Sequence, residues 1–234
     1  MKSESGVSGA VTLIIAVVVI IVFVLCGFLW YGNSVGRGRE AEMDRTAKDF
    51  QSSNDKMTDL WNEVGENDKA YETIDDGLWG AWMSANDNSL KTFTVKADKE
   101  IANRRKALDK AGAEVRARKQ LIAEMATAAE GIKTAPGLSD NEAKAAAVCV
   151  EAARENNRLD EELYDLKRQL ADIDAAMVKE FKNYLAGKSG EQEVSEVLKK
   201  AVAERNNVVL KANETRASRI EAADNFSADW RTAT

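Results

Sequence analysis

The sequence contains no histidine, only one proline (Pro136) and only two cysteines (Cys26 and Cys149). Without histidine, the chain lacks the side chain that most often transfers protons near neutral pH and the commonest ligand of transition metals. The cysteines show no CxxC spacing and have no evident disulfide partner. Enzymatic chemistry would therefore depend on carboxylates, lysine or tyrosine, and nothing here requires an oxidising compartment.

Aromatic residues are also scarce, at 6% of the chain, and the formal net charge is -6. This acidic balance argues against nucleic acid as a partner, because no face is basic enough to displace phosphate counterions. The basic runs "RRK" (104–106) and "RARK" (116–119) are bracketed by acids and are typical of a solvated helix face. With 44% hydrophobic and 31% charged residues, the composition predicts one folded domain beside one anchor.

A long apolar run follows the short N-terminal tail of residues 1–9. It extends from Ala10 to Tyr31, and Thr12 is its only clearly polar member. As a helix this run would be about 33 Å long, which matches the hydrocarbon thickness of a bilayer. Trp30 and Tyr31 stand at its end, where amphipathic rings prefer the membrane interface. The bulky ending "FLWY" disfavours cleavage as a signal peptide, so we expect a retained single-pass membrane anchor in contact with lipid.

The basic residues flanking this run predict its orientation. Lys2 precedes it, whereas Arg37, Arg39, Arg45 and Lys48 follow it closely. The positive-inside rule therefore predicts a cytoplasmic C-terminal domain.

The remainder of the chain has a helical repeat. After a predicted hinge at residues 32–39, apolar residues recur in alternating steps of four and three, the period of a helix packed along one seam. Glycines and polar clusters divide residues 40–234 into helices at about 40–64, 68–84, 89–133, 140–186 and 191–229. The second of these is either a separate short helix or a continuation of the first. Short connections predict antiparallel neighbours, and no strand pattern occurs. The expected fold is all-α: a transmembrane helix followed by an elongated antiparallel bundle with coiled-coil-like seams, which can close within one chain or in a homo-oligomer.

The longest seam, from Leu90 to Ile132, includes two arginines. Arg104 and Arg118 have two interpretations: their stems are buried while the guanidinium reaches solvent, or each pairs with a carboxylate on a facing helix. At the end of the fourth predicted helix, Gly187 fits a C-terminal cap, and Ser189 with Gln192 fits a capping box.

Three motifs that suggest chemistry fail on inspection. "AGKSG" (186–190) resembles a phosphate loop, but Lys182 occupies the position of the required glycine and no strand precedes it. Glu161 and Glu162 lack the Glu-x-x-His partners of a di-iron bundle. An acidic set lacks the spacing of a calcium loop; it comprises Glu63, Glu66, Asp68, Asp75 and Asp76. We therefore predict no catalytic residue, metal site or cofactor, and no enzymatic activity.

Two stretches, "LWNEV" (60–64) and "AYETIDDGL" (70–78), resemble the LemA family, with Trp61 and Ile74 in the corresponding places. "VCVEA" (148–152) and "RLDEELYDLKRQLADID" (158–174) resemble the later LemA helix with a one-residue slip. The chain departs from the family at Asp75 and Asp76, where LemA proteins have proline and asparagine, and it lacks the family's later tyrosine and proline. The resemblance implies a transmembrane helix followed by long antiparallel helices, and it implies no catalytic residue.

Three of the five tryptophans lie between Asp59 and Met83. Trp61 falls on the seam, whereas Trp79 and Trp82 are three residues apart and point to distinct faces of one helix. Both cannot be central in a slender core, so we expect at least one of Trp79 and Trp82 to contact a partner or the membrane surface.

These features favour a membrane-anchored structural or interaction module with an unidentified protein partner. Two alternatives stay open: a sensor that transmits a signal along the bundle, and a phage-encoded or envelope-remodelling factor. The few residues before the apolar run leave no room for a sensor domain on the far side of the membrane, which disfavours the first alternative.

Overall fold

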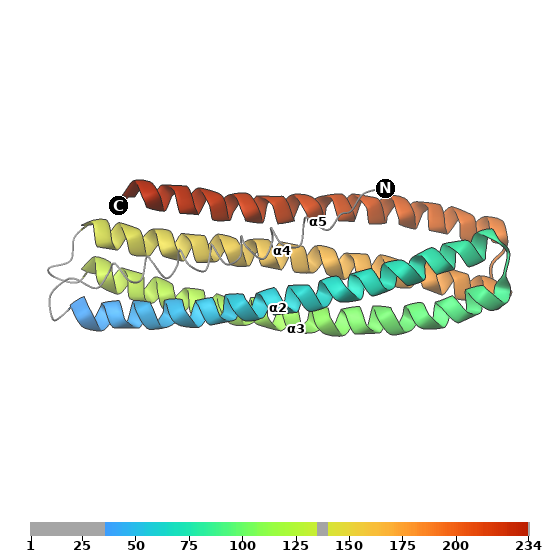
Figure 1. Cartoon of the computed structure of the whole chain (residues 1–234), viewed down its shortest axis with the longest axis horizontal. Helices are drawn as coiled ribbons and strands as arrows, with labels where there is room; N and C mark the ends of the chain where they lie inside the picture. The colour runs from blue at the N-terminus through green and yellow to red at the C-terminus, as the bar shows by residue number, and fades with distance from the viewer. Residues whose placement is uncertain (1–35, 135–139, 234) are drawn as a thin grey trace. The chain divides into compact units, whose positions relative to one another are not determined.

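The computed structural model describes residues 36–134 and 140–233. It contains four long helices (Figure 1): α2 (Gly36–Met83), α3 (Asp87–Thr134), α4 (Asp140–Leu185) and α5 (Glu191–Ala233). No strand occurs in these two ranges, so the predicted all-α bundle is confirmed for this part of the chain. The tail at 1–9 and the predicted anchor at 10–31 lie outside the described residues, and no described helix is long and apolar enough to cross a membrane.

The helices contribute to two compact units. Among the described residues, the first unit combines 36–58 with 113–134, 140–161 and 216–233, and the second unit combines Asp59–Gly112 with Glu162–Thr215. Each unit has its own core and its own polar contacts.

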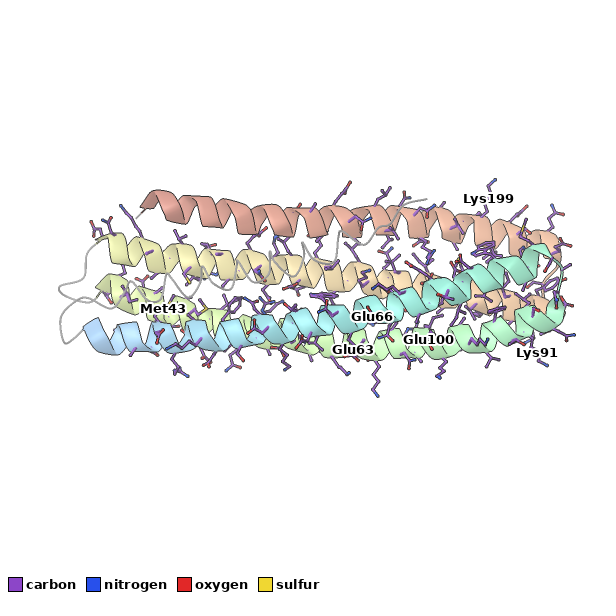
Figure 2. The ribbon with its side chains drawn as sticks, viewed as in Figure 1. Met43, Glu63, Glu66, Lys91, Glu100 and Lys199 are labelled. Carbon is purple, nitrogen blue, oxygen red and sulfur yellow. The ribbon has the colours of Figure 1, made fainter. Side chains whose placement is uncertain are left out.

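The core of the first unit is built from α2, α3 and α4. Met43 and Phe50 of α2 pack with Met125 and Ile132 of α3 and with Cys149 of α4. Figure 2 labels Met43, which is fully buried. Alanines fill most of the remaining core positions, and such small side chains allow the helices to approach closely.

All four helices contribute to the core of the second unit. Tyr71, Leu90, Phe181 and Leu198 represent α2, α3, α4 and α5 in its largest apolar cluster. Outside this core, the side chains of Lys91 and Lys199, labelled in Figure 2, are exposed. Two ion pairs show the relative direction of α3 and α4: Asp98 pairs with Lys182, whereas Arg105, later on α3, pairs with Asp172, earlier on α4. These neighbours are therefore antiparallel, as predicted.

The predicted seam of α3 is confirmed along its whole length. Every seam position is buried: Leu90, Thr94, Ala97, Ile101, Arg104, Leu108, Ala111, Val115, Arg118, Ile122, Met125, Ala129 and Ile132. A strict repeat of four and three therefore located the buried face of a 48-residue helix correctly.

Helix α2 continues through residues 65–67 as one helix, so the second predicted helix is a continuation of the first, and the predicted break between them is wrong. A glycine in a helix interior costs only about 1 kcal/mol relative to alanine, and Gly65 faces open space. The seam also continues past Val64 at the expected steps, through Asp68, Tyr71 and Asp75, so two of its next three positions are acids. Two acids on the buried face thus concealed the continuity of the helix.

Smaller corrections concern the hinge and the turns. Helix α2 begins at Gly36, so residues 36–39 of the predicted hinge are helical, while 32–35 lie outside the described residues. Gly187 caps α4 with a φ of 67°, as predicted. Helix α5 begins at Glu191, where the Val194 amide donates to the Gly190 carbonyl at 3.0 Å. Gly190 is therefore the residue immediately before α5. The predicted capping box requires Ser189 in that position, so this prediction is wrong.

Candidate functional site: two buried charged layers

A buried arginine lies at the centre of the first unit. Arg118 is 0% exposed, and its Nη1 donates to Asp160 Oδ2 at 2.5 Å. Its Nη2 donates to the side-chain oxygens of Asn54 and, at 2.7 Å, Asn156. The guanidinium also lies over the Phe50 ring, 4.7 Å from the centroid. We call these five residues the first charged layer; a guanidinium so thoroughly surrounded is fixed in orientation.

Glu114 extends the polar contacts of the first unit from α3 to α2. Ser53 Oγ donates to Glu114 Oε1 at 2.5 Å, and Lys56 pairs with the other carboxylate oxygen. Burial alone would raise the pKa of Glu114, but the hydrogen bonds from Lys56 and Ser53 outweigh it and lower the pKa. Glu114 is therefore an ionised carboxylate that joins two helices.

A second arginine lies in a comparable position in the second unit. Arg104 is 3% exposed; its Nη1 is 2.5 Å from Asp174 Oδ2, and its Nε is 2.9 Å from Asp68 Oδ1. Its guanidinium covers the Tyr71 ring at 4.5 Å. Lys167 approaches the other oxygen of Asp68 at 2.7 Å. This arginine therefore links α3 to carboxylates of both α2 and α4.

Helix α5 adds a further arginine to this cluster. Arg205 Nε lies 3.0 Å from Asp174 Oδ1, and its Nη1 lies 3.4 Å from Asp75 Oδ2. Burial raises the pKa of Asp75, and the attraction of Arg205 opposes this only in part. Burial likewise raises the pKa of Tyr71, so this phenol stays protonated. The second charged layer consists of Tyr71, Asp68, Asp75, Arg104, Asp174 and Arg205.

The two layers share a spacing along three helices. Three residues of the first layer have a counterpart in the second at a distance of two heptads, 14 residues, along the same helix: Asn54 and Asp68 on α2, Arg118 and Arg104 on α3, and Asp160 and Asp174 on α4. The seam thus carries the same kind of polar layer twice, once in each unit.

These contacts decide between the two interpretations of the seam arginines. Both Arg104 and Arg118 pair with carboxylates on facing helices. The partners Asp160 and Asp174 were not identified from the sequence, because they lie beside the predicted α4 seam rather than on it. Helix α4 buries a second stripe, which includes Val150, Ala153, Asn157, Asp160, Tyr164, Ala171, Asp174, Val178 and Phe181. The sequence therefore contains the signal for these partners: a second repeat of four and three along α4 that passes through Asp160 and Asp174.

The tryptophans singled out by the sequence lie together in the second unit. Trp79 makes an edge contact with Phe181 at 6.0 Å, and Trp82 contacts Phe181 at 5.6 Å and Tyr184 at 4.9 Å between ring centroids. Both tryptophans are partly buried. The expectation that at least one is left outside the core is thus replaced by a finer result: both share a single aromatic cluster and both keep part of their surface accessible.

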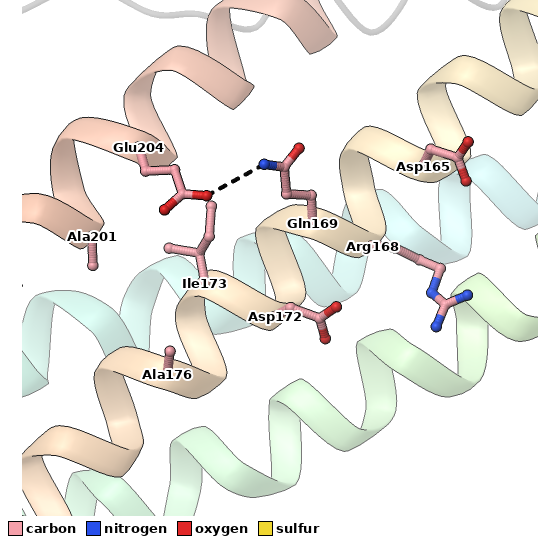
Figure 3. Close-up of a pocket in the computed structure, with 8 residues that line it drawn as sticks. All are labelled: Asp165, Arg168, Gln169, Asp172, Ile173, Ala176, Ala201 and Glu204. Atoms are coloured by element: carbon pink, nitrogen blue, oxygen red, sulfur yellow. Dashed lines mark hydrogen bonds between the residues drawn. The ribbon is translucent and has the colours of Figure 1, made fainter.

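An open pocket lies between α4 and α5 in the second unit (Figure 3). It has a volume of about 470 Å³ and is lined by Asp165, Arg168, Gln169, Asp172, Ile173, Ala176, Ala201 and Glu204. Gln169 Nε2 donates to Glu204 Oε1 at 3.4 Å across it. Arg168 bends toward the Tyr164 hydroxyl, to which it donates at 3.4 Å. The lining offers carboxylates and an amide but no paired nucleophile and base, which acyl or phosphoryl chemistry would require.

Three of the other candidate acids are engaged in ion pairs. Glu63 accepts two hydrogen bonds from Lys110, Glu66 pairs with Lys69, and Glu161 pairs with Lys119. Within residues 36–134 and 140–233, no group of three or more acidic or cysteine side chains is arranged to hold a metal ion. The "AGKSG" segment (186–190) is the connection between the end of α4 and the start of α5.

No protein-family profile, curated protein or solved structure matches the chain.

Proposed function

We propose that this protein is a membrane-anchored helical-bundle module with a structural or interaction role and no catalytic activity. One observation carries the proposal. The most deeply buried charged groups of the described helices are engaged with side chains of other helices instead of lining the α4–α5 pocket: Arg104, Arg118, Asp160 and Asp174. Buried polar contacts of this kind select which helices pair and in which register. The chemistry of the interior thus serves the assembly of the bundle.

The anchor in this proposal is the apolar segment at residues 10–31, and the domain from residue 40 onward is cytoplasmic by the positive-inside rule. The LemA resemblance supports the same arrangement of one membrane helix followed by long antiparallel helices. The partly accessible Trp79 and Trp82 are the proposed contact with a protein partner or the membrane surface, since tryptophan is enriched at both.

Membrane fractionation with alkaline extraction tests the anchor. The unsubstituted protein should stay in the membrane pellet, because an apolar helix resists extraction. Val18→Arg with Val19→Arg should release it, since each arginine at the bilayer centre costs about 3 kcal/mol. The matched control, Ser5→Arg with Ser8→Arg, adds the same charge before the apolar run and should not release the protein. Extraction of the unsubstituted protein would refute the anchor.

A second experiment addresses the orientation and the role. Asn103→Cys, at an exposed position, should react with a membrane-impermeant thiol reagent only after the cells are opened.

Affinity capture of the detergent-solubilised protein should recover a defined partner that is lost when Trp79 and Trp82 are replaced by alanine. A stoichiometric metal or organic cofactor in the purified protein would contradict the proposed role.

A further inference from the structure

Helix α5 is attached to the second unit by few large apolar side chains. Between Glu191 and Thr215, its buried hydrophobic residues are Val194, Leu198, Val208 and Ala212. Arg205 lies between them and reaches carboxylates on both α2 and α4. The attachment of α5 therefore depends on the second charged layer as well as on apolar packing.

Asp75 is the least satisfied carboxylate of that layer. It is 7% exposed, and its nearest cation is Arg205, at 3.4 Å from Oδ2. Its Oδ1 is buried without a hydrogen-bond partner among the described residues, and so is the Tyr71 hydroxyl. Arg104 is already held by Asp174 and Asp68. A buried carboxylate oxygen without a donor is costly, and more so when the group is ionised.

The groups around Asp75 come from all four helices. Tyr71 and Asp76 lie on α2, Arg104 on α3, Asp174 on α4 and Arg205 on α5. Asp174 and Asp76 repel a negative charge on Asp75, while the two arginines attract it. Since Asp174 also engages both arginines, their attraction is divided between two carboxylates.

We propose that Asp75 is a proton-binding site of the second unit, and that proton uptake there strengthens the attachment of α5 to α2 and α4. Protonation removes the incompletely compensated negative charge and supplies a donor, while Arg205 keeps its contact with Asp174. When α5 moves away, Asp75 is hydrated and the ionised form is no longer disfavoured. The proton therefore binds more tightly to the packed state, and by linkage it favours that state. This inference does not depend on the proposed membrane role.

The direction of the pH effect follows from burial. Burial raises the pKa of Asp75, the neighbouring Asp174 and Asp76 add to it, and Arg205 and Arg104 oppose it. The packed state therefore binds more protons than the unpacked state between the two pKa values. Attachment of α5 strengthens as the pH falls through the raised pKa, and the gain is complete below the ordinary value of about 4.

Thiol labelling reports on this attachment directly. With Cys26→Ser and Cys149→Ala as background, Ala212→Cys places a thiol on the buried face of α5, and Asn213→Cys places one on its exposed face. The measured quantity is the rate of Ala212→Cys divided by the rate of Asn213→Cys, both with 4,4′-dithiodipyridine. This ratio corrects for the pH dependence of the reagent. We expect the ratio to fall between pH 8 and pH 4, by about tenfold for each unit of pKa difference between the packed and open states. In the Asp75→Asn background the ratio should not change between pH 8 and pH 4. A ratio that is constant or rises on acidification of the unsubstituted chain overturns the proposal.

Urea unfolding provides the independent test. Asp75→Asn keeps the shape and removes the charge, so it should raise the urea midpoint at pH 8 and leave it unchanged near pH 4. Asp172→Asn, at an exposed position paired with Arg105, is the matched control and should retain the pH dependence of the unsubstituted chain. A lower midpoint for Asp75→Asn at pH 8 overturns the proposal. So does a titration midpoint at or below about 4 for the Asp75 carboxyl carbon, measured by NMR on the unsubstituted protein.

Discussion

At the scale of single residues, the Arg118–Asp160 pair shows how a charge is accommodated in an alanine-rich core. Both side chains are 0% exposed, and burying two charges is expensive unless each is well paired. Asparagine oxygens accept from the second guanidinium nitrogen, and Phe50 covers its face. A buried pair of this kind adds little net stability, but it makes any arrangement that separates the two charges very unfavourable.

Removing one member of this pair should therefore be strongly destabilising. We expect Asp160→Asn to lower the free energy of unfolding by about 3 to 5 kcal/mol, because it leaves a buried guanidinium without its carboxylate. The neighbouring Glu161→Gln breaks only the exposed pair with Lys119 and should cost less than about 1 kcal/mol. Urea unfolding measures both. Replacing both members, by Arg118→Met with Asp160→Leu, should recover most of the loss; equal losses for Asp160→Asn and Glu161→Gln would contradict the role of burial.

The sequence predicted one member of each buried arginine–aspartate pair. Arg104 and Arg118 were identified because they interrupt an apolar repeat, and a charge on a buried face needs an explanation. Asp160 and Asp174 were missed because α4 contacts more than one helix and buries a wider stripe than a single seam. The register that brings α3 and α4 together is a tertiary property, so no pattern within one helix specifies which acid faces which arginine.

At the scale of helices, glycines have opposite roles according to what they face. Gly65 lies on α2 with open space where a Cβ would be, whereas a Cβ on Gly112 of α3 would lie 2.6 Å from the Tyr164 ring of α4. Gly112 is therefore a point of close approach between two helices. Gly65 makes no such contact and only weakens the helix.

Alanine substitutions should separate these roles. Gly65→Ala should raise the free energy of unfolding by about 0.5 to 1 kcal/mol, which is the difference in helix propensity. Gly112→Ala makes the same chemical change but should lower it by about 1 to 3 kcal/mol, because Tyr164 must move. Thermal unfolding followed by circular dichroism measures both changes. The interpretation fails if the two substitutions shift the midpoint in the same direction.

Helix number was harder to predict than helix position. The bounds of α3, α4 and the start of α5 were predicted to within a few residues, because glycine and polar clusters mark their ends. The first two predicted helices are one, because Gly65, the partly buried Asp68 and the buried Asp75 resemble a break when each residue is judged by polarity alone. The acids contact arginines that are distant in sequence, Arg104 and Arg205, and this compensation was not visible locally.

At the scale of the whole molecule, the two compact units could not be predicted. The repeat of four and three is uniform along each helix, so it contains no boundary at Thr58 or Gly112, where the units divide. What distinguishes the units is the composition of their cores. The first has alanines, methionines and one charged layer, and the second has an aromatic cluster and a layer that includes α5. The distinction therefore depends on contacts between helices.

If each layer belongs to its own unit, the layers should contribute independently to stability. Arg118→Lys and Arg104→Lys each keep the charge and most of the stem but lose the planar fork that contacts several acceptors, so each should be destabilising. Their layers share no residue, so the effects in the double variant should add to within about 0.5 kcal/mol. Urea unfolding of the two single variants and the double variant closes the cycle. A coupling above about 1 kcal/mol would show that one layer senses the other, and the spacing of 14 residues on α2, α3 and α4 would then mark a path of communication along shared helices rather than a repeated means of specifying helix register.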